Sequence, residues 1–173
     1  MSAPSEVTGM PATAAGTAVL RNVLQVAAVM QIALIAGATF GIWRGLGAAQ
    51  FSAATFIDVH QELVRGLNVL LPAMGAAFAV LMAALAWLAR SRRPALYFYL
   101  AALALGIAAG LLTRFWNQPI NAQVMEWTVQ TIPADWTAIR DSWWRGHVIR
   151  TFISIAALVA TVLALKTDVP AKR

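Results

Sequence analysis

The sequence has no cysteine, so disulfide bonds, thiolate metal sites and iron–sulfur clusters are all excluded. Charge is also scarce, because Asp, Glu, Lys and Arg together make up 12% of the 173 residues. Soluble domains usually have about a quarter of their residues charged. Hydrophobic residues make up 60% of the chain. This composition excludes an ordinary soluble domain and predicts an all-α integral membrane protein.

Acidic residues are the scarcer charge, and the net charge is +6. The basic residues are scattered along the chain and form no soluble basic face, so we expect no nucleic-acid partner. They do indicate the topology. Three arginines lie in residues 90–93, and Lys166, Lys172 and Arg173 follow the last apolar run. By the positive-inside rule both segments face the cytoplasm.

Long apolar runs separate these basic residues, and about 20 residues suffice to cross a membrane. We predict four transmembrane helices at about residues 23–43, 66–89, 94–113 and 148–165. They form a four-helix bundle over residues 19–166, with a helical cap between the third and fourth spans. Residues 1–18 are expected to be a disordered tail and residues 167–173 a C-terminal tail. Four spans place both termini in the cytoplasm, and we expect the bacterial inner membrane.

The unusual polar residues gather in one stretch, residues 114–150. It contains five of the seven tryptophans, His147 and the sequence Asn117-Gln-Pro-Ile-Asn121, which we interpret as a turn. Pro119 suits the first turn of a short interfacial helix over residues 120–131, and Asp135 can cap the helix that follows.

Helical spacing places the key side chains of this stretch on one face. Trp136, Arg140, Trp143, His147 and Arg150 follow steps of 4, 3, 4 and 3 residues. Only fifteen residues separate Arg150 from Lys166, so Arg150 must lie at or just inside the hydrocarbon boundary. A charge at that depth needs a partner. The candidate carboxylates are those of Asp58, Glu62 and Glu126.

Two other segments carry polar side chains next to predicted spans. Asp58, Glu62 and Arg65 lie on one helical face, either as an interfacial ion pair or as part of a pocket wall with His60 and Asn68. Gly106 and Gly110 have the spacing that lets helices approach closely, and Arg114 follows one turn later. Arg114 either reaches a lipid phosphate or holds an anionic substrate group.

The turn and the helix after it resemble the anthrone oxygenase-like family of small four-helix membrane proteins. The matching residues are Asn117, Pro119, Asn121, Trp144, His147 and Arg150, with Pro72 as a weaker match. The resemblance covers roughly residues 23–165. It implies oxygenation of a polycyclic phenolic anthrone to an anthraquinone, with dioxygen as oxidant and no obvious organic cofactor. Many bacterial members of the family are of unknown activity.

The first hypothesis is therefore a cofactor-independent oxygenase. His147 is the candidate base, and Arg150, with Arg114, would stabilise the enolate oxygen. The substrate is expected to be a lipophilic aromatic molecule that reaches the site through the bilayer. Asn117, Asn121 and Asn68 would bind its polar groups, and Trp143 and Trp144 would stack on its rings.

Two other hypotheses stay open at this point. A metal oxidoreductase would use His60, His147 and a carboxylate from Glu62, Asp58 or Glu126 to bind iron or copper, and the two histidines could also hold a haem. A non-enzymatic subunit or assembly factor would instead dock on another membrane protein or on a second copy of the chain. We expect His60, His147 and Arg150 to converge on one cavity at the non-cytoplasmic end of the bundle.

Overall fold

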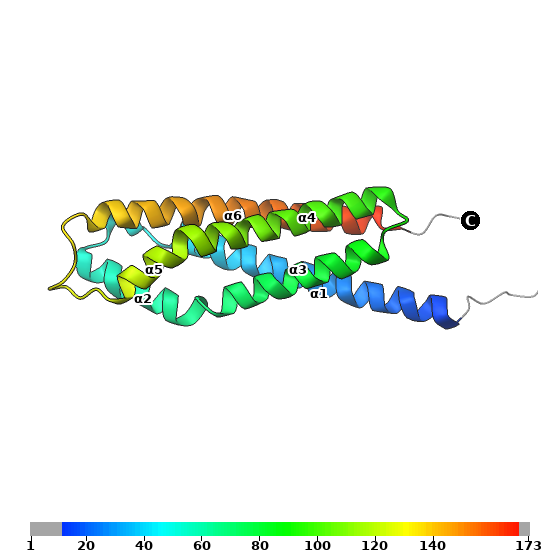
Figure 1. Cartoon of the computed structure of the whole chain (residues 1–173), viewed down its shortest axis with the longest axis horizontal. Helices are drawn as coiled ribbons and strands as arrows, with labels where there is room; N and C mark the ends of the chain where they lie inside the picture. Colours follow the sequence, from blue (N-terminus) through cyan, green and yellow to red (C-terminus); the bar gives the residue numbers. More distant parts are fainter. Residues whose placement is uncertain (1–11, 170–173) are drawn as a thin grey trace, which may run out of the picture.

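The computed structural model describes residues 12–169, and side chains from residue 16 onward, and every regular element in this range is helical. Figure 1 shows a long bundle of six α-helices. These are α1 (Ala12–Gly45), α2 (Ala53–Leu67), α3 (Leu70–Leu88), α4 (Arg93–Leu112), α5 (Gln118–Met125) and α6 (Trp136–Thr167). A 3-10 turn η1 (Ala48–Gln50) precedes α2, and a π-helical segment η2 (Thr113–Asn117) joins α4 to α5.

Four helical stretches are long and apolar enough to cross a membrane, as the sequence predicts. They cover Gly16–Gln50, Ala53–Leu88, Arg93–Met125 and Trp136–Thr167. Each is longer than the apolar run that predicted it, because polar turns continue the helix past the hydrophobic part. Residues 12–18, expected to belong to a disordered tail, form the first turns of α1. Residues 1–11 and 170–173 lie outside the described part of the chain.

The main core lies between α1, α3, α4 and α6 and is built from small and large side chains in contact. Ala28, Phe78, Met82, Tyr99 and Ala157 are among its fully buried members. At Gly106 the Phe78 ring of α3 lies 3.1 Å from where a Cβ would stand. Gly106 therefore lets α3 and α4 pack closely at this level, as its spacing in the sequence predicts.

A second layer, formed by α2, η1 and α5, covers one end of the bundle, which we call the cap end. Phe56 and Ile57 of α2 are buried against Val124 and Trp127 at the end of α5. The Gln61 side chain donates hydrogen bonds to the free carbonyls of Val124 and Trp127 at 3.1 and 3.0 Å. This satisfies carbonyl groups that lack a partner inside α5 and fixes α2 against it.

The predicted turn at Asn117–Asn121 does not form. The chain continues from α4 through η2 directly into α5, so residues 93–125 make one unbroken helical rod. Pro119 lies in the first turn of α5, where a missing backbone N–H leaves no hydrogen bond unmade. Asp135 does stand at the N-cap of α6, but its side chain makes no capping hydrogen bond there.

The opposite end, which we call the terminal end, carries the start of α1, the loop between α3 and α4, and the end of α6 (Figure 1). Asp168 follows α6 and its side chain is fully buried there. It pairs with Arg92 and accepts hydrogen bonds from Tyr99 and Gln25 at 3.1 and 2.9 Å. The segment expected to be a C-terminal tail therefore begins with a residue that ties α6 to α1 and α4.

Candidate active site at the cap end

The two residues expected to be catalytic lie in direct contact inside the bundle. Arg150 Nη2 donates a hydrogen bond to His147 Nδ1 at 2.8 Å, one turn apart on α6. His147 Nε2 lies 2.9 Å from the carbonyl oxygen of Thr39 on α1. An arginine is only a donor, so Nδ1 accepts and Nε2 carries the proton that the Thr39 carbonyl accepts. Both nitrogens of the fully buried imidazole are thus engaged.

Arg150 has no carboxylate partner among the described residues. Beyond His147, its Nη1 donates to the Thr113 hydroxyl at 3.4 Å, and its buried Nε has no hydrogen-bond partner. The carboxylates expected to neutralise it, those of Asp58, Glu62 and Glu126, are all exposed. Glu62 instead pairs with Arg65 on the surface of α2, as the simpler interpretation of that face predicts. A largely buried cation held only by neutral groups is a site prepared for an anion.

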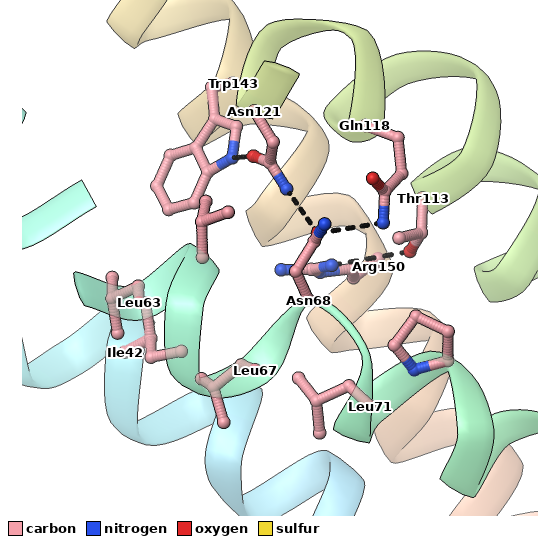
Figure 2. Close-up of a pocket in the computed structure, with 12 residues that line it drawn as sticks. Ile42, Leu63, Leu67, Asn68, Leu71, Thr113, Gln118, Asn121, Trp143 and Arg150 are labelled. Atoms are coloured by element: carbon pink, nitrogen blue, oxygen red, sulfur yellow. Dashed lines mark hydrogen bonds between the residues drawn. The ribbon is translucent and has the colours of Figure 1, made fainter. Parts of the chain in front are cut away.

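A network of side-chain amides lies beside this arginine (Figure 2). Asn68 Oδ1 accepts hydrogen bonds from Gln118 at 2.9 Å and from Asn121 at 3.0 Å. Asn121 Oδ1 in turn accepts from the indole nitrogen of Trp143 at 2.8 Å. The break between α2 and α3 at Asn68 brings this amide inward. The network therefore joins three segments, 68, 118–121 and 143, that are far apart in the sequence.

Two cavities meet at Arg150. The larger has a volume of about 350 Å³ and lies between α1, α3, α4 and α6. The smaller, of about 40 Å³, is the one drawn in Figure 2 and reaches the amide network. Five residues line both: Leu71, Pro72, Thr113, Gln118 and Arg150. The arrangement is an apolar chamber with a cationic and amide-lined end.

The aromatic side chains around the pair form a stack. The ring of His147 stacks on Trp143 and Trp144, with centroids 5.3 and 5.8 Å apart. Trp143 also contacts His60, at 4.6 Å between centroids. Trp143 lines the smaller cavity, but neither indole lines the larger one. Trp143 and Trp144 therefore support His147 in this structure, rather than forming the walls of the large chamber.

His60 lies apart from the expected point of convergence. It is buried in a small hollow of about 10 Å³ lined by Phe56 and both tryptophans, and neither ring nitrogen has a hydrogen-bond partner. With Glu62 exposed, the metal set of His60, His147 and Glu62 is not brought together. The described residues contain no group of three or more His, Asp or Glu side chains that could hold a metal ion.

Asn117 and Arg114 lie at the edges of this site. Asn117 is fully buried and donates to the Trp143 carbonyl at 3.0 Å, while its Oδ1 packs against Gly146. It lines neither of the cavities at Arg150, so its expected contact with substrate stays a prediction. Arg114 lines the larger cavity and is exposed on the outer surface of the bundle.

Thr39, Thr113 and Gln118 belong to the site but were missed from the sequence. Thr39 acts through its backbone carbonyl, which no side-chain pattern reveals. Thr113 and Gln118 stand on either side of the π-helical segment, and a turn was expected there instead. Their polarity next to an apolar span was the one available signal.

The fold and site define a class: a helical protein with four membrane-spanning stretches, and a buried guanidinium–imidazole pair at the polar end of an apolar cavity. The chain belongs to the anthrone oxygenase family, because the family model described as anthrone oxygenase matches residues 61–160. The match runs from α2 into α6 and includes Asn68, the 117–121 segment, His147 and Arg150. No curated protein and no solved structure matches the chain.

Proposed function

We propose that the protein is a membrane oxygenase that converts a lipophilic anthrone-like substrate to a quinone with dioxygen. The observation that carries the proposal is Arg150, a largely buried guanidinium without a carboxylate partner that lines an apolar cavity. A substrate whose oxygen becomes negatively charged during the reaction would supply the missing charge. The family match supports the same chemistry.

The cavity suits this class of substrate in size and in lining. Its volume of about 350 Å³ lies in the range of roughly 300–1,000 Å³ typical of small-molecule sites. Its walls are apolar, with Ile32, Phe78 and Ala157 among them, while Thr39, Gln118 and Arg150 supply polar atoms. Such a chamber accepts fused aromatic rings and holds their oxygen atoms at one side.

The reaction balances without a further oxidant. A base removes a proton from the central ring carbon, and the resulting enolate attacks dioxygen to form a C–O bond at that carbon. The peroxide formed takes up a proton. Loss of the second hydrogen of the same carbon, with cleavage of the O–O bond, then gives the new carbonyl and one water. The substrate loses four electrons and dioxygen gains them.

In this proposal Arg150 binds the enolate oxygen and His147 removes the proton. His147 Nδ1 is occupied by Arg150 in the structure, so the base is free only when the guanidinium turns away from it. Binding of Arg150 to the substrate oxygen would cause that movement, and the Thr39 carbonyl would hold the imidazole in place. Substrate binding and activation of the base would then be one event.

Dioxygen uptake by the protein in liposomes, with anthrone as substrate, tests the proposal. Arg150→Met is expected to abolish the protein-dependent uptake, and Arg150→Lys to retain part of it, because a point charge without the planar fork binds the oxygen less well. Arg145→Met is the matched control, since Arg145 is exposed on the same helix. Protein-free liposomes correct for spontaneous oxidation of anthrone.

Protein-dependent uptake that Arg150→Met leaves unchanged would remove Arg150 from the reaction. A wild-type protein that binds anthrone without consuming dioxygen would favour the non-enzymatic hypothesis. Metal analysis of the same preparation, with uptake measured before and after chelation, separates the cofactor-independent reaction from one that uses iron or copper.

A further inference from the structure

We propose that substrates enter the large cavity sideways from the bilayer, through an opening between α3 and α4 that Gly75 and Gly110 keep wide. The identity of the ligand rests on the proposed function. The opening itself is a feature of the helix packing and can be tested without any substrate.

The exposed residues of the cavity wall all lie on one side. They are Pro72 and Ala76 of α3, Ile107 and Gly110 of α4, and Arg114 of η2. The wall residues contributed by α1 and α6 are buried or half-buried; they are Ile32, Ile35, Thr39, Arg150, Ser154 and Ala157. The cavity therefore reaches the surface between α3 and α4, and the other two helices close its back.

Glycines explain why these helices part at this level. At Gly106 the Phe78 ring fills the space beside the backbone, and α3 and α4 are in close contact. One turn nearer the cap end, a Cβ on Gly110 or on Gly75 would meet no atom within 4 Å. Both glycines line the cavity. Two positions without side chains, next to a tight contact, thus leave a gap in the seam between the helices.

The surface around this gap is apolar. Ile107, Leu111 and Phe115 are 47%, 52% and 74% exposed, and Val80 of α3 is 69% exposed. These side chains belong to helices long and apolar enough to cross a membrane, so the gap opens toward lipid. A ligand that uses it must be soluble in the hydrocarbon core.

The charges near the gap indicate what such a ligand carries. Arg114 is exposed where the cavity reaches the surface, and Arg150 lies inside. A flat, lipophilic molecule with an acidic phenol or enol oxygen fits both the apolar walls and the buried cation. Leucine at Gly75 or Gly110 would fill the gap without touching Arg150, so the two glycines would decide how large a ring system enters.

The absence of cysteine from the chain provides a direct test, because an introduced thiol is the only one present. Ser154 lines the cavity from α6 and is 3% exposed, and Ser154→Cys changes little in size. We expect N-phenylmaleimide, a lipid-soluble reagent, to label this thiol in liposomes. Adding Gly75→Leu and Gly110→Leu should slow the labelling about tenfold or more, because the side chains overpack the gap.

Gly41→Leu is the matched control for the glycine changes. Gly41 is exposed on α1, outside the lining of either cavity, and a Cβ there would meet nothing within 4 Å. Labelling that is slowed only by the α3 and α4 changes supports the opening. Three outcomes overturn it: no labelling of the parent thiol, no effect of the two leucines, or equal slowing by Gly41→Leu. If Ser154→Cys does not fold, Ala109→Cys on α4 provides a second thiol in the same wall.

Anthrone under nitrogen, where it cannot react with dioxygen, tests the ligand separately. It is expected to protect the thiol from labelling, and Arg150→Met should remove the protection. If the leucines slow labelling but anthrone gives no protection, the opening stands and the substrate class, with the proposed function, fails. Protection by oleate but not by anthrone would show that the chamber takes up a lipid instead.

Discussion

Arg150 and His147 occupy each other's reactive positions: Nη2 of the guanidinium donates at 2.8 Å to the one imidazole nitrogen that is free of a proton. His147 can therefore act as a base only after Arg150 moves, and Arg150 can bind an anion without losing a carboxylate partner.

Substitution of His147 should separate binding from chemistry. His147→Gln is expected to lower kcat for anthrone about 100-fold or more, as loss of a general base does, with a small change in KM. Initial rates of dioxygen uptake over a range of anthrone concentrations give both constants. His60→Gln is the matched control, because His60 is buried in the same aromatic stack but lines neither cavity at Arg150. A larger loss of kcat in His60→Gln than in His147→Gln would point to the wrong base.

Gly146 on α6 should tolerate no side chain. A Cβ there would lie 3.0 Å from Asn117 Oδ1 and 3.3 Å from Trp116, and Asn117 is fully buried. Gly146→Ala is therefore expected to destabilise the bundle, because overpacking costs about 1–3 kcal/mol and outweighs a gain in helix propensity of up to about 1 kcal/mol.

Unfolding of the purified variant in detergent, followed by circular dichroism, measures this change. Gly41→Ala serves as the reference, since its Cβ meets no neighbour and only the propensity gain remains. Equal stability of the two variants would show that α4 and α6 are packed less tightly near Asn117 than the structure indicates.

Asp168 should matter for stability and not for turnover. Asp168→Asn removes the charge that pairs with Arg92 and weakens the bonds from Tyr99 and Gln25 at the terminal end. We expect a loss of about 1–3 kcal/mol in the free energy of unfolding, as for other buried polar groups left poorly paired. Glu62→Gln, in an exposed ion pair, should change it by less than about 1 kcal/mol. A fall in kcat for Asp168→Asn at a temperature where the variant stays folded would argue that the two ends are coupled.

The orientation in the membrane follows from the charges and can be measured. Ser91 and Ala134 are exposed, in the loop between α3 and α4 and in the loop before α6 respectively. In intact cells a membrane-impermeant maleimide should label Ala134→Cys and leave Ser91→Cys unlabelled until the cells are opened. The reverse pattern would place the termini outside the cytoplasm, against the positive-inside rule.

The four spans could be predicted from hydropathy because an apolar run of sufficient length has one stable form in lipid. The ends of the helices could not. The fourth span was expected from residue 148, whereas α6 begins at Trp136, because its polar first turns pack under the cap and not in lipid. The spacing of Trp143, His147 and Arg150 correctly predicted a shared face, since helical periodicity depends only on backbone geometry.

The partners of these side chains were beyond the reach of the sequence. A carboxylate was expected beside Arg150 because a charge in lipid is costly, yet its neighbours are His147 and Thr113. Which residue meets it depends on how α4 and α6 pack, and a helical wheel of one segment carries no such information. The expected convergence of His60 failed for the same reason: α2 faces α5, and Trp143 contacts both imidazoles.

The π-helical segment at Thr113–Asn117 fixes the register of everything that follows it. A π-turn holds about one residue more than an α-turn, and each residue of an α-helix turns the chain by about 100°. Deleting a single residue between 113 and 117 would rotate α5 by about that angle and swing Gln118 and Asn121 away from Asn68. An evolving member of the family could thus dismantle the amide network without replacing any of its side chains, by the loss of one codon.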